Sequence, residues 1–152
     1  LRGNAKLAVI ESAKIPLPNH SLEAVVSNLV FMMVPSVEEV DRIFYEINRV
    51  LFPNGTFTFC ISHPCFLDQK FCFHHNQFPV GFNYLKEGQE YNFVLINKEG
   101  IEIANPHFLD YNYSLETYLN LLSDNGFSLC KTIEVKTERD AYPPYLILHS
   151  KK

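Results

Sequence analysis

The chain has 152 residues and contains no tryptophan, only six glycines and no long apolar stretch. Its longest apolar run, Leu29 to Pro35, is far shorter than the ~20 residues that a membrane-spanning helix needs. Positive charge is not in excess either, since 13 basic residues accompany 17 acidic ones without long runs of one sign. These absences argue against a membrane partner and against a nucleic-acid-binding surface, which requires clustered Lys and Arg.

Cysteine is also scarce, because four residues are too few for a secreted disulfide scaffold. We therefore expect a cytoplasmic protein with reduced thiols, most of them buried as small hydrophobic side chains. Two short clusters, His63 with Cys65 and Cys72 with His74 and His75, contain the residue types that bind zinc. Their one-residue spacings are tighter than usual for paired zinc ligands, so we predict no metal site.

Apolar residues in the first third of the chain alternate between strand and helix patterns. Lys6–Glu11 and Thr56–Ser62 are β-rich, and Leu22–Leu29 is a nearly continuous apolar run, typical of a parallel strand covered on both faces. Ser36 and Glu39 form a capping box, and the apolar residues that follow recur at 3.6-residue spacing. This order predicts an α/β protein with parallel strands in its first half.

The second half ends in a predicted helix and two strands. Ser114 is positioned to cap a helix that runs to Asn125, and strands are predicted at Phe127–Val135 and Tyr145–His149. The short connection between those two strands predicts an antiparallel C-terminal hairpin. Residues 66–113 are irregular and rich in aromatic side chains, so we interpret them as an insertion.

Four segments resemble motifs of class I S-adenosylmethionine-dependent methyltransferases, in particular the type 11 domain of small-molecule and ubiquinone-type enzymes. They are Glu11–Pro18, Ser21–Asn28, Arg49–Gly55 and Ile61–Phe66, and they follow one another in the family's order. The resemblance implies a Rossmann-like methyltransferase sheet with strand order 3-2-1-4-5-7-6. It also implies transfer of a methyl group from S-adenosylmethionine to a small-molecule acceptor.

The chain departs from the family in what it does not contain. The family's glycine-rich loop has no counterpart, Glu23 stands where the family has Asp, and Asn54 replaces a turn glycine. By resemblance, residues 1–152 are a single, partial domain that corresponds to the C-terminal two-thirds of a methyltransferase, with a lid at about 66–113. We expect such a chain on its own to bind S-adenosylmethionine weakly or not at all, which would leave it inactive. We also expect Lys6–Glu11 to pair beside Leu22–Leu29 or with a second copy in a homodimer.

The resemblance implies roles for two groups of residues near strand ends. Those expected to contact S-adenosylmethionine are Glu11, Ser12, Ala13, Asn28, Leu29 and Val30. Those expected to act on the acceptor are His63, Tyr84 and His107. Histidine ordinarily titrates near neutrality, so His63 is suited to act as a general base, or else as a wall of the acceptor pocket. The alternatives are a solvent-exposed strand end for Glu11, a turn cap for Asn28, and plain aromatic packing for Tyr84.

Two functions from different classes therefore remain at this point. The first is a methyltransferase that acts on a small molecule. The second is a non-catalytic remnant with the methyltransferase fold that serves as a binding or scaffold module.

Overall fold

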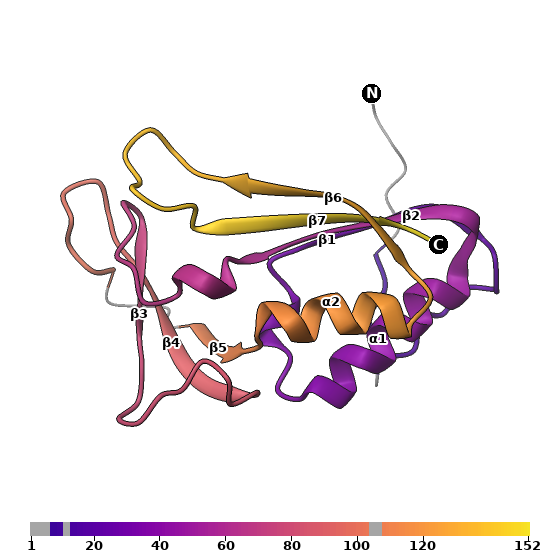
Figure 1. The fold of residues 1–152 in the computed structure, drawn as a ribbon, viewed down its shortest axis with the longest axis horizontal. Helices are drawn as coiled ribbons and strands as arrows, with labels where there is room; N and C mark the ends of the chain where they lie inside the picture. The colour runs from indigo at the N-terminus through magenta and orange to yellow at the C-terminus, as the bar shows by residue number, and fades with distance from the viewer. Residues whose placement is uncertain (1–6, 11–12, 104–107) are drawn as a thin grey trace.

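The computed structural model describes residues 7–10, 13–103 and 108–152. Figure 1 shows their arrangement, with two helices packed beneath a long sheet and a smaller sheet to one side. The elements are β1 (Leu22–Asn28), η1 (Phe31–Met33), α1 (Val37–Val50), β2 (Leu51–Ser62), η2 (Pro64–Phe66), β3 (His74–Gln77), β4 (Gln89–Leu95), β5 (Phe108–Asn112), α2 (Leu115–Asp124), β6 (Ser128–Val135) and β7 (Tyr145–Lys151). None of the described helices is both long and apolar enough to cross a membrane.

The main sheet has the strand order β1-β2-β7-β6. β1 and β2 are parallel, β7 is antiparallel to β2, and β6 and β7 form an antiparallel hairpin. This arrangement confirms the predicted combination of parallel strands with a C-terminal hairpin. It also reproduces the 4-5-7-6 part of the strand order that the resemblance implied.

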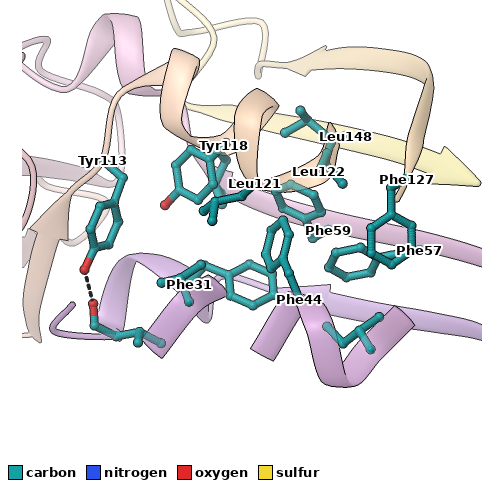
Figure 2. Packing of buried hydrophobic residues seen from close by; sticks show 14 of the residues in the cluster. Phe31, Phe44, Phe57, Phe59, Tyr113, Tyr118, Leu121, Leu122, Phe127 and Leu148 are labelled. Atoms are coloured by element: carbon teal, nitrogen blue, oxygen red, sulfur yellow. Dashed lines mark hydrogen bonds between the residues drawn. The ribbon is translucent and has the colours of Figure 1, made fainter. Parts of the chain in front are cut away.

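Both helices cover the same face of this sheet and enclose an aromatic core (Figures 1 and 2). Phe57 and Phe59 point from β2 toward the helices because alternate strand residues share a face. Phe31 and Phe44 meet them edge to face, at ring-centroid distances of 5.2–6.0 Å. Each fully buried aromatic side chain of this kind contributes about 1.5–3 kcal/mol, so these rings fix α1 on the sheet.

Local signals in the sequence set where the two helices begin. The Ser36 side chain accepts a hydrogen bond from the Glu39 backbone N–H, at 3.2 Å. The Ser114 hydroxyl accepts one from the Thr117 N–H, at 3.1 Å. Both predicted helix starts are therefore confirmed.

The strand predicted at Thr56–Ser62 is longer in the structure, because β2 begins directly where α1 ends. The register with β1 shifts between Leu51 and Thr56, and Asn54 adopts a φ of 66° within this irregularity. A Cβ on Gly55 would lie 2.9 Å from the Phe52 carbonyl oxygen, so only glycine fits there. The Pro-Asn-Gly signal thus forms a bulge inside the strand rather than a separate loop.

A second sheet, with the order β3-β4-β5, lies wholly within the predicted insertion. His74 of β3 joins it to the main sheet, because its ring stacks on Phe93 of β4 at 4.5 Å and on Tyr145 of β7 at 5.7 Å. Burial lowers the pKa of His74 to about 4, so the ring is neutral at physiological pH. The joint between the two sheets is therefore a stack of uncharged rings.

Two predictions about the start of the chain are wrong. Residues 7–10 form no strand, and Leu7 and Val9 are 97% and 88% exposed, whereas Lys6 and Glu11 lie outside the described residues. β1 is also not covered on both faces among the described residues, because both helices lie on one side of the sheet (Figure 1) and Val26 is 76% exposed. The physical reason is that strand pairing depends on the path of the chain, and the loop after residue 13 is bound to α1 instead of running along β1.

Candidate functional site

The parallel strands β1 and β2 end side by side, and ligands of open α/β sheets bind at such carboxyl ends. Asn28, the last residue of β1, pairs with Cys60. Leu29 then adopts a φ of 55°, a left-handed conformation that is uncommon for leucine, while its N–H donates to the Cys60 carbonyl oxygen at 2.9 Å. Strained backbone conformations of this kind are common at ligand-binding sites. Here the turn places Leu29 and Val30 in the walls of two different cavities.

Beyond Leu29 lies a cavity of about 180 Å³, which we call the inner hollow. Its walls come from the end of β1, from η1, from the end of β2 and from the second sheet. The lining residues are Leu29, Met32, Met33, Ser62, Phe93, Phe108 and Asp110. Five of these seven side chains are apolar, which suits an apolar ligand with one polar group.

The polar group that stands out in the inner hollow is the carboxyl of Asp110, which is only 4% exposed. Asp110 lies in β5 directly opposite Tyr91 of β4. Burial raises the pKa of Asp110 from its ordinary 3.8 to about 7. A buried carboxyl that titrates near neutrality in an apolar cavity is able to accept a proton from a ligand.

Sequence reasoning missed Asp110. It selected histidines and aromatic residues in this region, although Phe108, Asp110 and Asn112 alternate along β5 and therefore share one face. Asp110 and Asn112 are both buried. A polar pair on the inward face of a strand is the signal that could have identified this residue.

Tyrosines hold the surroundings of the inner hollow in place. Tyr91 is buried, and burial and the nearby Asp110 raise its pKa. The Tyr113 hydroxyl donates to the Val34 carbonyl oxygen at 2.6 Å, the dashed contact in Figure 2. This hydrogen bond connects the residue after β5 to the residue that follows η1, so these two walls of the cavity are fixed relative to each other.

A second cavity of about 340 Å³, which we call the outer hollow, lies between the loop after residue 12, β1 and α1. Its lining residues are Ile10, Ala13, Ile15, Val25, Ser27, Val30, Phe31, Glu39, Ile43 and Ile47. Ala13 adopts a φ of 60° at its edge. The walls are mainly apolar, and Glu39 is the only carboxylate among the described lining residues.

Arg49 of α1 fixes the loop that borders the outer hollow. Its guanidinium donates to the carbonyl oxygens of Ile15 and Leu17 and to Asn19 Oδ1, at 2.8–2.9 Å. It also pairs with Glu46 at 2.7 Å, and Glu46 in turn accepts from the Ile15 N–H. The hydrogen bond from Arg49 lowers the pKa of Glu46, so this carboxylate stays charged. The arginine of the Arg49–Gly55 motif thus has a structural role here.

Three of the six predicted donor-binding residues line one of the two hollows. Leu29 lines the inner hollow, and Val30 and Ala13 line the outer one. Asn28 is exposed at the end of β1. Two further predicted residues, Glu11 and Ser12, lie outside the described residues, as does His107.

His63 is buried, but it is not among the residues that line the inner hollow. Its Nδ1 accepts a hydrogen bond from the Cys65 N–H at 3.3 Å, and its Nε2 lies 3.3 Å from Glu134 Oε1. The ring also packs on Phe66 at 4.6 Å. Both ring nitrogens therefore have protein partners. The hydrogen bond from the Cys65 N–H makes His63 the N-terminal cap of η2. Its catalytic role remains a prediction.

Tyr84 is likewise outside the inner hollow. Its hydroxyl oxygen accepts a hydrogen bond from the Leu115 N–H, at 2.8 Å, and so supports the first turn of α2. Burial raises the pKa of Tyr84. The structure therefore does not bring Tyr84 and His63 together with Asp110, and the catalytic role of Tyr84 also remains a prediction.

The cysteines and histidines considered for zinc have other surroundings. Within the described parts of the chain, no group of three or more His, Cys, Asp or Glu side chains is arranged to hold a metal ion. The expectation that most cysteines are buried is wrong, because Cys65 and Cys130 are exposed and Cys60 and Cys72 are half-buried. Cys60 lies in β2, Cys65 in η2 and Cys130 in β6, whereas Cys72 lies in the bend before β3.

Comparison with known proteins identifies the fold. Residues 2–59 match the sequence family described as "Methyltransferase domain". An S-adenosylmethionine-dependent methyltransferase from Mesorhizobium loti superposes with a TM-score of 0.62 at 19% identity, over 94% of this chain and 68% of that one. The chain has the class I methyltransferase fold. The resemblance noted from the sequence motifs is thereby confirmed, and three of the four motifs fall within residues 2–59.

Other solved methyltransferases give the same result. The S-adenosylmethionine-dependent methyltransferase from Clostridium acetobutylicum ATCC 824 matches with a TM-score of 0.66 at 13% identity, over 96% of this chain and 64% of that one. The 1,6-didemethyltoxoflavin-N1-methyltransferase of Burkholderia thailandensis matches with a TM-score of 0.54 at 12% identity, over 94% and 48%. This methyltransferase-fold chain thus spans between about half and two thirds of the length of these three proteins. None of the curated proteins compared with it matches.

Proposed function

We propose that the protein is an S-adenosylmethionine-dependent methyltransferase that methylates a small-molecule acceptor. The observation that carries this proposal is that Leu29 and Val30, adjacent at the end of β1, line two different cavities. A methyl transferase needs two binding sites that meet at one point, because the transferred carbon must pass directly from donor to acceptor. The end of β1 provides that point, with the outer hollow for the donor and the inner hollow for the acceptor.

The residues of the outer hollow fit one end of the proposed donor. Ile15, Val25 and Val30 supply apolar walls against which a flat adenine ring packs well. The hydrogen bonds from Arg49 hold the loop at Ile15 in place, so this wall is formed before a ligand binds. When bound, S-adenosylmethionine supplies a methyl group on a positively charged sulfur, and the task of the protein is to align an acceptor with it.

The small size of the inner hollow supports a small acceptor. At about 180 Å³, it has room for one ring with a few substituents. The Burkholderia relative was solved with 1,6-didemethyltoxoflavin and S-adenosylhomocysteine bound, which shows that this fold accommodates such a pair.

Calorimetry on the whole gene product with S-adenosylmethionine and S-adenosylhomocysteine tests the proposal. We expect binding that is abolished by Val30→Arg, which places a charged side chain in the outer hollow. Val80→Arg, the same substitution at a fully exposed loop position, is the control and should bind like the unmodified protein. If neither compound binds, or if Val30→Arg has no effect, the donor site is not where we place it. A complete lack of binding would favour the scaffold alternative.

We also propose a cytoplasmic location and the possibility of a homodimer. The four cysteines are free in the described structure, which suits a reducing compartment. Among the described residues, the outer edge of β1 pairs with no other strand, so a second copy could add to it. The oligomeric state measured by light scattering, with and without Val26→Lys on β1, tests the dimer.

A further inference from the structure

The inner hollow combines apolar walls with one buried acid, and this combination restricts what it can bind. Phe93 and Phe108 come from the second sheet, and Met32 and Met33 from η1. Asp110 contributes a carboxyl that is almost fully shielded from solvent. A buried carboxylate is costly unless a partner satisfies it, so a ligand that brings a hydrogen-bond donor is favoured here.

The volume of the cavity sets the size of that ligand. An apolar cavity of about 150 Å³ holds a benzene molecule, so the inner hollow at about 180 Å³ takes a single six-membered ring with one or two small substituents. Aromatic rings also pack well edge to face on the phenylalanine walls. A fused or elongated ligand would extend beyond these walls toward solvent, because Met33 and Phe108 are partly exposed.

The charge of the site disfavours two kinds of acceptor. An anionic ligand would be repelled by the Asp110 carboxylate in an environment that screens charge poorly. A protonated amine would be attracted, but it must first give a proton to Asp110 before its nitrogen has a lone pair, and its ion pair with the carboxylate is then lost. What remains is a neutral ring that carries a proton on the atom to be methylated.

Resting on the proposed function, we infer that the acceptor is a single-ring aromatic compound with a ring O–H or N–H, and that Asp110 accepts its proton. The proton-bearing oxygen or nitrogen donates a hydrogen bond to the Asp110 carboxylate, inside the cavity that Leu29 also lines. Asp110 is then both the residue that orients the acceptor and the one that removes its proton.

The step balances as a direct displacement. A lone pair on the acceptor oxygen or nitrogen forms a bond to the methyl carbon while the sulfur–methyl bond breaks, and that electron pair remains on sulfur. The acceptor proton passes to the Asp110 carboxylate, which releases it to solvent when the product leaves. No oxidation or reduction is involved.

Among the ionisable groups described near Asp110, only Asp110 changes its charge near pH 7. Tyr91 of β4 and Tyr118 of α2 both face it, and burial raises the pKa of each, so both stay neutral near pH 7. Ser62 at the end of β2 does not ionise in this range. The raised pKa of Asp110, about 7, means that the carboxylate is present at pH 8 and largely protonated at pH 5.

Binding of phenol and of anisole, its O-methyl ether, tests the inference by NMR titration of the whole gene product at pH 8. The two probes share a ring and differ in the proton. We expect phenol to bind about tenfold more tightly, the effect of one hydrogen bond to a charged group. The ratio of phenol affinity to anisole affinity should fall to about one in Asp110→Leu. In Asp110→Asn, which keeps a neutral hydrogen-bond acceptor, it should fall to roughly threefold. In the unmodified protein at pH 5, where Asp110 is largely protonated, this ratio should also be low.

Asp124→Asn, the same change at the exposed end of α2, should keep the tenfold preference. Equal binding of phenol and anisole to the unmodified protein, or a preference that survives in Asp110→Leu, would overturn the inference. Calorimetry with S-adenosylmethionine on the same samples separates the two proposals. Donor binding without a phenol preference refutes only the acceptor assignment, and a phenol preference without donor binding refutes the proposed function.

Discussion

Replacing Asp110 by asparagine should change the free energy of unfolding by an amount that depends on pH. Relative to the unmodified chain, the variant should gain stability as the pH rises. The folded protein keeps a proton on Asp110 that the unfolded chain has already released, because burial raises the pKa of this carboxyl from 3.8 to about 7. Its stabilising contribution is therefore complete below pH 3.8 and is lost as the pH rises toward 7. Asparagine does not ionise and shows no such loss.

The expected size follows from the two pKa values. A change from 3.8 to about 7, at 1.36 kcal/mol per pKa unit, corresponds to about 4 kcal/mol. Small domains are stable by about 5–15 kcal/mol, so this is a large share of the total. His74 acts in the opposite direction over a similar range, because its lowered pKa of about 4 makes the protein lose stability as the pH falls from 6.5 toward 4. That effect is common to both proteins and cancels in their difference.

Urea denaturation followed by circular dichroism at intervals from pH 4 to pH 8 measures the effect. The free energy of unfolding of Asp110→Asn minus that of the unmodified protein should rise by about 4 kcal/mol across this range. Asp124→Asn, at an exposed helix end, should follow the unmodified protein throughout. A difference that stays constant from pH 4 to pH 8 would refute the reasoning, because it would mean that Asp110 is ionised in the folded protein as readily as in the unfolded chain.

Four further substitutions test other parts of the structure. Tyr113→Phe removes the buried hydrogen bond to Val34 and should lower the free energy of unfolding by about 1–2 kcal/mol in urea denaturation; no change would mean that water replaces the bond. Phe44→Ala empties the centre of the aromatic core and should cost about 3–5 kcal/mol, whereas a loss below 1 kcal/mol would show that the core collapses around the gap. Glu11→Ala in the whole gene product should weaken S-adenosylmethionine binding by roughly 1–2 kcal/mol by calorimetry, and an unchanged affinity would remove Glu11 from the site. His63→Ala should lower turnover and leave donor affinity nearly unchanged; a loss of donor binding would place His63 elsewhere.

Elements whose signals are local were predictable from the sequence. Ser36 and Ser114 cap their helices as expected, because a cap depends on residues within one turn. The hairpin of β6 and β7 was predictable for the same reason, since a short connection forces its strands to pair. The methyltransferase resemblance could be recognised because its motifs lie at these same strand and helix ends.

What depends on distant parts of the chain was not predictable. The β-rich character of residues 7–10 gave no information on whether a partner strand lies alongside, and in the structure none does among the described residues. Asp110 escaped notice because its burial results from the meeting of two sheets and η1, which no local pattern records. Histidine and tyrosine were chosen for their chemistry, but His63 and Tyr84 use their polar atoms to hold η2 and α2.

The inner hollow has walls of two different origins, and this has a consequence for how acceptor preference can change during evolution. Leu29 and Ser62 belong to the main sheet, whose aromatic core holds the fold together, whereas Phe93 and Phe108 belong to the three-stranded insertion. Substitutions at Phe93 and Phe108 would reshape the cavity without altering the packing of α1 and α2. A lineage could therefore acquire a new acceptor by exchanging residues in the insertion, and a protein engineer could randomise the same two positions to look for one.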